Sequence, residues 1–206
     1  MARYLDVHPI DPQSRLIDQA VNLLHDNGLL AYPTDSGYAL GIALGNRDGL
    51  DRIKKLRELD DKHHFTLVCR DFAQLGQLVH LSNSAFRAIK AATPGPYTFI
   101  LPATAEVPKR LMHPKKRTVG VRIPEHRVVS ALLEAMGEPI LSSTLILPGE
   151  SAPMTDGWTV KETLDNLVDV VIEAGEVGTD PTTVVDYSLD APAVVRVGAG
   201  DPSRFE

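Results

Sequence analysis

The sequence predicts an α/β fold in which a twisted mixed β-sheet and its helices form a single domain. The chain has 206 residues, of which 43% are hydrophobic, enough for one sizeable core and too few for two full domains. Strand-like and helical segments follow one another without strict alternation, which favours a mixed sheet packed against helices. No repeat, low-complexity tract or long linker divides residues 1–206, so we expect one domain.

The N-terminal part of the chain shows two helical and two strand patterns. Asp11 and Pro12 fit the N-cap and first position of a helix, and apolar residues then recur at helical spacing until Asn27 and Gly28. Asn46 fits the cap of a second helix, in which apolar residues recur every three positions. The expected elements are a helix at 12–27, strands at 29–32 and 38–44, and a helix at 47–59.

The rest of the chain contains further short apolar runs bounded by turn residues, a pattern typical of strands. These predicted strands lie at 65–69, 97–101, 118–123, 139–147, 168–174, 182–187 and 193–197. Helical patterns occupy parts of 71–90 and the segment 126–137. The stretch 147–157 is rich in Pro and Gly, and we expect it to be a surface loop.

Cysteine content and hydropathy exclude several classes of protein. The single cysteine, Cys69, excludes an internal disulfide, and a lone thiol among apolar strands is typical of a core residue in a reducing compartment. No segment approaches the roughly 18 apolar residues that span a bilayer, and no apolar stretch follows the arginine near the N-terminus. We therefore expect a cytoplasmic protein with no membrane partner.

The net charge of −6 conceals an asymmetry along the chain. Residues 46–127 contain 16 lysines and arginines against 8 aspartates and glutamates, whereas the remainder contains 5 against 19. A basic middle segment in an acidic chain favours a local anion-binding site over a general nucleic-acid-binding surface. A solvated surface of mixed charge is the alternative explanation.

Five polar or turn-forming residues follow the first predicted strand. Pro33 has no amide proton and is expected to close the ladder, so that Thr34, Asp35 and Ser36 stand at a strand end, where ligands commonly bind. Gly37 permits close approach of the backbone to a small ligand. The alternative is a plain hairpin connection.

Lys55 and Arg57 lie near the end of the second predicted helix. Residues two apart on a regular helix face different sides, so both reach one ligand only if the helix ends or bends there. A planar guanidinium and a compact ammonium suit the phosphates of a nucleotide. A solvated helix face is the commoner explanation of an isolated pair of this kind.

Hydroxyl and arginine side chains also occur in or beside the later strands. The hydroxyls are compatible with ordinary strand residues, because threonine is favoured in sheets. An arginine within an apolar strand requires an acidic partner, a carbonyl group or a bound anion. The candidates are Thr98, Arg122, Ser142, Ser143, Thr144, Thr182, Thr183 and Arg196. The dispersed histidines lack metal-ligand spacing, and we expect no metal site formed by protein side chains.

Seven segments, in this order, resemble the YrdC-like family. They are YPTDSGYALG, the triplet Lys55-Leu56-Arg57, TPGPYTFILP, TVGVRIPEH, PILSSTLILPG, PTTVVD and VVRVG. The stretch RELDDKHHFTLVCRD is most similar to the YciO branch of that family. The resemblance covers nearly the whole chain and implies a twisted α/β sheet around a large, positively lined concave cleft.

The family includes L-threonylcarbamoyladenylate synthases, which combine L-threonine, bicarbonate and ATP and release pyrophosphate. Their product supplies the threonylcarbamoyl group of a modified adenosine in transfer RNA. Such sites act chiefly by positioning and charge stabilisation, and Mg²⁺ would arrive with the ATP phosphates. The resemblance implies catalytic and nucleotide-binding roles for Lys55 and Arg57, further nucleotide contacts from Thr98, Thr144 and Arg196, and substrate contacts from Thr34, Ser36, Arg122, Ser142 and Thr182.

The sequence departs from the synthase pattern in two places. Where the synthases have Ser-x-Asn, this chain has Thr144-Leu145-Ile146, so an aliphatic side chain replaces an amide. A histidine usually found after the strand that follows Lys-x-Arg is replaced near Cys69, and His63 and His64 lie a few residues earlier. A lost polar group in a ligand site costs about 1–3 kcal/mol, so we expect weakened adenylate formation.

Two classes of function follow. The first is an ATP-dependent enzyme, a nucleotidyltransferase that forms a carbamoyl adenylate from L-threonine or a similar small acid. The second is a non-catalytic protein whose basic cleft binds double-stranded or ribosomal RNA, which the basic runs HPKKR and RIKKLR favour. Scarce aromatic residues and overall acidity argue against a base-stacking single-strand binder. We favour the enzyme.

Overall fold

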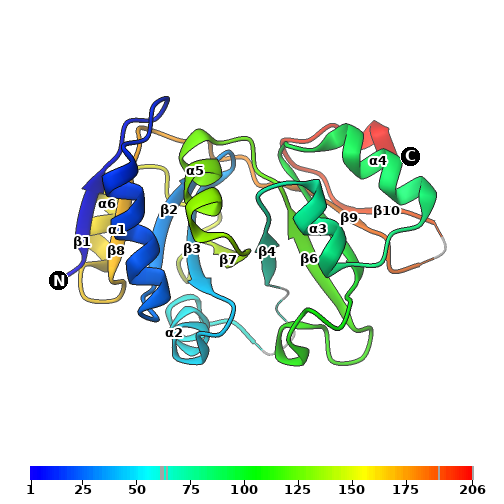
Figure 1. Cartoon of the computed structure of the whole chain (residues 1–206), viewed down its shortest axis with the longest axis horizontal. Helices are drawn as coiled ribbons and strands as arrows, with labels where there is room; N and C mark the ends of the chain where they lie inside the picture. The colour runs from blue at the N-terminus through cyan, green and yellow to red at the C-terminus, as the bar shows by residue number, and fades with distance from the viewer. Residues whose placement is uncertain (61–62, 64, 190, 206) are drawn as a thin grey trace.

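The computed structural model describes residues 1–60, 63, 65–189 and 191–205, and a single mixed sheet runs through it (Figure 1). The strands pair in the order β1-β8-β2-β3-β7-β4-β6-β5-β9-β10, and both parallel and antiparallel neighbours occur. The α/β mixed-sheet class predicted from the sequence is therefore confirmed. The strands are β1 (Arg3–Asp6), β2 (Leu30–Thr34), β3 (Gly37–Ala43), β4 (Thr66–Val68), β5 (Tyr97–Pro102), β6 (Thr118–Arg122), β7 (Ile140–Thr144), β8 (Val170–Glu173), β9 (Thr183–Asp186) and β10 (Ala193–Arg196).

Helices cover both faces of this sheet. The α-helices are α1 (Ser14–His25), α2 (Arg47–Arg57), α3 (Phe72–Leu78), α4 (Asn83–Ala92), α5 (Arg127–Met136) and α6 (Gly157–Leu164). Helices α1 and α5 pack against each other and against β2, whereas α6 packs against β8 and β2 from behind them (Figure 1). Leu30 and Tyr32 of β2 join the core under α1 and α5, and the alternate residues Leu29 and Ala31 join the other core.

Helix α1 begins at Ser14, so the predicted start at Asp11 and Pro12 is wrong. The residues before it form a separate turn, in which the amide of Asp11 donates to Nδ1 of His8 at 3.0 Å. The amide of His8 donates in turn to Oε1 of Gln13 at 3.0 Å. Because these local hydrogen bonds already satisfy the amides of the turn, the helix starts two residues later than the Asp-Pro pair suggested.

Helix α2 begins as predicted and ends where the candidate site begins. Oδ1 of Asn46 accepts a hydrogen bond from the amide of Gly49 at 2.7 Å, so Asn46 is the N-cap. Glu58 takes the left-handed conformation, with φ of 51°, directly after the last helical residue. The helix therefore stops at Arg57, which allows this side chain to turn towards the sheet.

The β2–β3 hairpin corrects one expectation from the sequence. Strand β2 continues to Thr34, and Pro33 lies opposite Tyr38 within the ladder instead of closing it. The proline is tolerated because β2 pairs with β8 only at Leu30 and Ala31, so that its far side is free of a strand partner at Pro33. The predicted alternative of a hairpin connection is correct, and the hairpin also borders the site.

The loop after β7 packs on this hairpin. Gly37 closes the turn with φ of 97°, and a Cβ atom there would lie 2.5 Å from Cγ of Pro153. No helix or strand occurs between Thr144 and Gly157, as predicted for the Pro- and Gly-rich stretch. Cys69 is buried as predicted, and burial raises the pKa of its thiol. Within the described residues, no helix has the length and apolarity needed to span a membrane.

Candidate functional site

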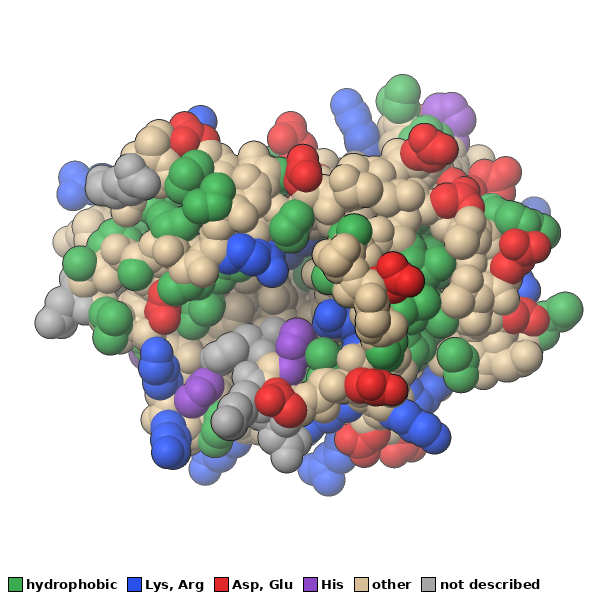
Figure 2. Space-filling view, turned by 180° about the vertical axis from the view of Figure 1, so that it is seen from behind, with side chains coloured by type: hydrophobic (Ala, Val, Ile, Leu, Met, Phe, Trp, Pro, Cys, Tyr) green, Lys and Arg blue, Asp and Glu red, His purple; other side chains and the backbone are tan. Residues whose placement is uncertain are grey.

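A cavity of about 360 Å³ lies against the middle strands of the sheet. Figure 2 shows a hollow near the centre of the face turned away in Figure 1, with basic side chains and a histidine beside it. Among the described residues, the side chains of the lining that are charged or titrate near neutral pH are Arg57, His63, Arg122 and Arg196. No carboxylate among the described residues lines the cavity. The cavity therefore favours anions.

The floor of the cavity is a row of residues that crosses four neighbouring strands. Thr66 of β4 lies opposite Ser142 of β7 on one side and Gly120 of β6 on the other. Ile100 of β5 continues the row opposite Gly120. A Cβ atom on Gly120 would lie only 3.1 Å from Oγ1 of Thr66, so glycine keeps this part of the floor open. The neighbouring row faces the core and consists of Leu67, Val121 and Phe99.

Arg122, at the end of β6, forms one end of the cavity and is only 7% exposed. Its Nη1 donates to Oγ of Ser36 at 3.0 Å, and its Nη2 forms an ion pair with Asp35. The other carboxylate oxygen of Asp35 accepts from the amide of Glu125 at 2.9 Å. The Nε atom of Arg122 is buried without a partner among the described residues, so the guanidinium keeps unused donor capacity.

Arg196 approaches the same end from β10. Its Nε and Nη2 donate to the carbonyl oxygen of Thr182 at 3.0 and 2.8 Å, and Nη2 also reaches Oγ1 of Thr182 at 3.0 Å. The hydroxyls of Thr182 and Thr98 are 2.9 Å apart. Desolvation and the charge of Arg122 lower the pKa of Arg196. An anion between the two guanidinium groups would relieve their repulsion.

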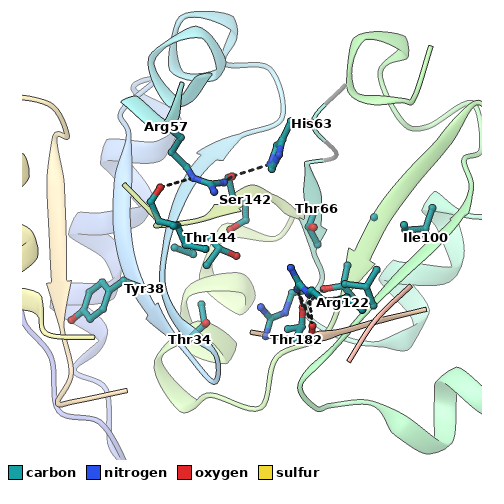
Figure 3. Close-up of a pocket in the computed structure, with 17 residues that line it drawn as sticks. Thr34, Tyr38, Arg57, His63, Thr66, Ile100, Arg122, Ser142, Thr144 and Thr182 are labelled. Atoms are coloured by element: carbon teal, nitrogen blue, oxygen red, sulfur yellow. Dashed lines mark hydrogen bonds between the residues drawn. The ribbon is translucent and has the colours of Figure 1, made fainter. Parts of the chain in front are cut away.

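Arg57 forms the opposite end of the cavity, where its hydrogen-bond partners among the described residues are neutral. Its Nε donates to the carbonyl oxygen of Ile146 at 3.1 Å, and its Nη1 donates to Oγ of Ser143. The same Oγ lies 3.3 Å from Nε2 of His63, and Figure 3 shows these three groups in line. Burial lowers the pKa of Arg57. Thr66 and Ser142 lie between Arg57 and Arg122 in this view.

Comparisons with known proteins agree with the fold. The family model Sua5_yciO_yrdC, with the description "Telomere recombination", matches residues 22–198. The chain belongs to the Sua5/YciO/YrdC family. It is 46% identical to the uncharacterized protein YciO of Escherichia coli over the full length of both chains. The crystal structure of E. coli YciO matches with a TM-score of 0.97 and full coverage of both chains.

More distant members of the family include enzymes. A threonylcarbamoyl-AMP synthase of Vibrio vulnificus is 30% identical over 79% of this chain and 87% of its own length. The structure of P. abyssi Sua5 complexed with L-threonine is 25% identical, with a TM-score of 0.86 over 95% of this chain and 57% of that one. Membership of the YrdC-like family and similarity to YciO, both predicted from the sequence, are confirmed.

Most of the residues assigned by the family resemblance line the cavity. Two of them do not: Ser36 contacts the lining residues Arg122 and Thr34 from outside the cavity, and Lys55 borders a separate groove beside Leu167. Lys55 and Arg57 do not line the same cavity in this structure, because α2 stays helical through Lys55 and residues two apart on a helix face different sides. The lining residues are Thr34, Arg57, Thr98, Arg122, Ser142, Thr144, Thr182 and Arg196. Their individual roles stay predictions.

Several residues of the cavity lining were not assigned to a site from the sequence. Thr66 and Gly120 belong to the floor, and the strand pairing that brings them together is not readable from a single sequence. His63 was noted only as a histidine displaced from the family pattern, and it lines the cavity. His64 lies outside the described residues. Ile146, which stands where the synthase pattern has an amide, also lines the cavity.

The cavity lining does not fit a metal ion. No group of three or more His, Cys, Asp or Glu side chains suited to a metal occurs in the part of the chain that the structure describes. The lining offers guanidinium, hydroxyl, imidazole and apolar groups, whereas Mg²⁺ prefers carboxylate and phosphate oxygens. Protein side chains of the cavity are therefore unsuitable as magnesium ligands.

Proposed function

We propose that this chain binds L-threonine, bicarbonate and ATP in the cavity and forms L-threonylcarbamoyladenylate with release of pyrophosphate. The observation that carries the proposal is a lining with three arginines and, among the described residues, no carboxylate, in a family that includes threonylcarbamoyl-AMP synthases. All three substrates bear anionic groups. A volume of about 360 Å³ suits a small acid together with part of a nucleotide.

The two ends of the cavity suit different anions. Arg122 is fixed by Asp35 and Ser36 and retains a free Nε donor, which fits the single negative charge of an amino-acid carboxylate. Hydroxyls for the amino acid come from Thr34, Ser142 and Thr182. In this proposal Arg196, Thr98, Thr144 and Arg57 contact the nucleotide. Lys55 would reach the phosphates only by extending from its groove around the end of α2.

The reaction needs orientation and charge stabilisation more than a protein nucleophile. The ammonium of the amino acid first loses a proton. The neutral amino nitrogen then attacks the carbon of bicarbonate, and loss of water leaves a carbamate. A carbamate oxygen then attacks the α-phosphorus of ATP, and pyrophosphate leaves. Guanidinium groups that line the cavity stabilise the negative charge that develops on the phosphoryl oxygens. The adenylate would supply the threonylcarbamoyl group for transfer-RNA modification.

Magnesium has a limited place in this proposal. Because the lining lacks suitable oxygen ligands, we propose that Mg²⁺ is carried into the cavity by the ATP phosphates. No step of the reaction is assigned to a metal held by protein side chains.

The RNA-binding alternative has weaker support. Of the two basic runs that favoured it, 113–117 and 52–57, only Arg57 lines the cavity. A cavity of about 360 Å³ is also too small for a duplex. RNA binding therefore stays a prediction, which steep salt dependence and competition by ATP would support.

The proposed function is tested by measuring pyrophosphate release from ATP, with bicarbonate and each amino acid supplied in turn. L-threonine is expected to give the highest rate, and omission of bicarbonate is expected to abolish it. Ligands that bind the native state raise its melting temperature, so ATP with L-threonine should also do so. No pyrophosphate and no thermal shift at millimolar ligand would contradict the proposal.

A further inference from the structure

We propose that Ser143 and His63 form a proton relay, in which the hydroxyl of Ser143 accepts a proton from the amino group of the bound amino acid while passing its own proton to Nε2 of His63. This inference rests on the proposed function, because it concerns the deprotonation that carbamate formation requires. It assigns a catalytic role to two side chains at the Arg57 end of the cavity, neither of which the sequence pattern assigns.

The first reason is the charge of the cavity. An amino acid enters near neutral pH as an ammonium, which cannot attack bicarbonate until it has lost a proton. Three guanidinium groups line the cavity and disfavour that ammonium. The proton therefore needs an acceptor nearby.

The second reason is the shortage of acceptors in the lining. Arginines cannot accept a proton, and burial raises the pKa of Tyr38, whose hydroxyl donates to the carbonyl oxygen of Ile172 at 3.0 Å. Threonine and serine hydroxyls are too weakly basic to keep a proton. Imidazole is the one group in the described lining whose ordinary pKa is near neutrality, and it belongs to His63.

The third reason is the hydrogen-bond inventory of Ser143. Its oxygen has one proton to donate and two acceptor sites, and Arg57, which can only donate, occupies one acceptor site. If Nε2 of His63 carried a proton, Oγ would accept twice and its own proton would have no partner among the described residues. If Nε2 of His63 carries no proton, the hydroxyl of Ser143 donates to it across 3.3 Å. One acceptor site of Oγ then stays open for an N–H group of a ligand.

The surroundings of His63 suit an acceptor that exchanges its proton with water. The residue is partly exposed, and its ring meets the ring of Phe65 edge to face with centroids 5.1 Å apart. Its amide donates to the carbonyl oxygen of Asp60 at 3.2 Å. Among the described residues, Arg57 from α2 and Asp60 from the segment after α2 are charged neighbours of His63. Because His63 is partly exposed, a proton received from Ser143 has a way out to solvent.

The proton balance of the step is simple. An N–H bond of the ammonium breaks as its proton moves to Oγ of Ser143, and the O–H bond of Ser143 breaks as its proton moves to Nε2 of His63. Ser143 regains a neutral hydroxyl, the amine becomes neutral, and His63 becomes an imidazolium. The amine lone pair then forms the N–C bond with bicarbonate, and His63 releases its proton to water.

Nitrogen-15 NMR of the imidazole rings tests the geometry without requiring activity. The wild-type protein is expected to hold neutral His63 with its proton on Nδ1, because Nε2 accepts from Ser143. Ser143→Ala is expected to remove this preference, while the signals of His80, an exposed histidine outside the cavity, stay unchanged. A proton on Nε2 in the wild type, or a His63 tautomer indifferent to Ser143→Ala, would overturn the relay.

Kinetics of pyrophosphate release test the role. His63→Gln is expected to lower turnover at neutral pH by about 100-fold or more and to make the rate rise with pH where the wild type is flat, because hydroxide replaces the lost base. His80→Gln is the matched control and is expected to match the wild type. Full turnover and an unchanged pH profile in His63→Gln would overturn the relay and leave the proposed function intact. An inactive wild type would contradict the proposed function, and the NMR result would still decide the relay geometry.

Discussion

The two ends of the cavity hold their arginines in different ways. Arg122 is 7% exposed and pairs with a carboxylate, Asp35, whereas Arg57 is held by a carbonyl oxygen and a serine hydroxyl. The charge of Arg122 is therefore largely balanced by the protein, and the charge of Arg57 is not. This difference indicates that Arg122 supplies fixed geometry for a small monoanion, and that Arg57, like Arg196, supplies net positive charge for phosphates.

The largest effect on stability is expected from removing the ion pair between Arg122 and Asp35 at the Arg122 end of the cavity. Arg122→Ala leaves Asp35 buried without its partner and is expected to lower the free energy of unfolding by about 3–5 kcal/mol. Urea unfolding measures this loss. The double variant Arg122→Ala/Asp35→Ala should recover part of it, since no lone charge remains. Strictly additive losses of unfolding free energy in the double variant would show that the ion pair does not stabilise this end of the cavity.

The Arg57 end of the cavity is expected to contribute less to the stability of the fold and more to nucleotide binding. Arg57→Ala removes hydrogen bonds to neutral groups and is expected to cost about 1–2 kcal/mol of unfolding free energy. It should also abolish pyrophosphate release and the thermal shift caused by ATP. Arg57→Lys, which keeps the charge and loses the planar fork, serves as the matched variant and should retain part of the ATP shift. An undiminished ATP shift in Arg57→Ala would contradict the comparison.

His126, near Asp35 at the Arg122 end of the cavity, is expected to make the stability of the fold depend on pH. Burial lowers the pKa of His126, at the start of α5, below its ordinary value of 6.5, and the charge of Asp35 opposes this only in part. Below that value the unfolded chain binds a proton that the folded protein resists, so this contribution to stability is complete above pH 6.5 and is lost as the pH falls. His126→Gln should flatten the slope of urea midpoint against pH between 5 and 7. His80→Gln should leave the slope unchanged, and an unchanged slope in both variants would contradict this expectation.

The smallest effect is expected from restoring an amide side chain at position 146, near the Arg57 end of the cavity. Ile146 lines the cavity and is partly exposed, so Ile146→Asn should change the unfolding free energy little and raise pyrophosphate release about fivefold, equivalent to roughly 1 kcal/mol. Leu145→Asn is the contrasting control, because Leu145 is fully buried and its replacement by a polar amide should destabilise the fold. Equal destabilisation by both substitutions would show that position 146 belongs to the core.

Much of the fold was predictable because its signals are local. The cap at Asn46, the apolar period of α5 and the short β-branched runs each depend on neighbours in the chain, and the structure has these elements where the patterns indicate them. The start of α1 was not predictable, because His8 forms a competing turn that uses the amide of Asp11. Pro33 was misjudged because the absence of a second strand partner at that point depends on sheet order.

The candidate site was predictable where residue type carries the signal. Arg122 and Arg196 stood out because arginine is unusual in an apolar strand, and both line the cavity. Thr66 and Gly120 became part of the site through strand register, which a single sequence does not reveal. Lys55 does not line the cavity, and the sequence alone does not show which side of α2 faces the sheet.

The most direct test of the account is to detect the proposed product itself. The protein is incubated with ATP, L-threonine and bicarbonate labelled with carbon-13, and the reaction is analysed by mass spectrometry. The account predicts an adenylate of threonylcarbamate that carries the label, forms together with pyrophosphate and is absent with Arg57→Ala. Wild-type protein that binds ATP and L-threonine but forms no labelled adenylate would contradict the proposal that this cavity catalyses formation of the adenylate from them.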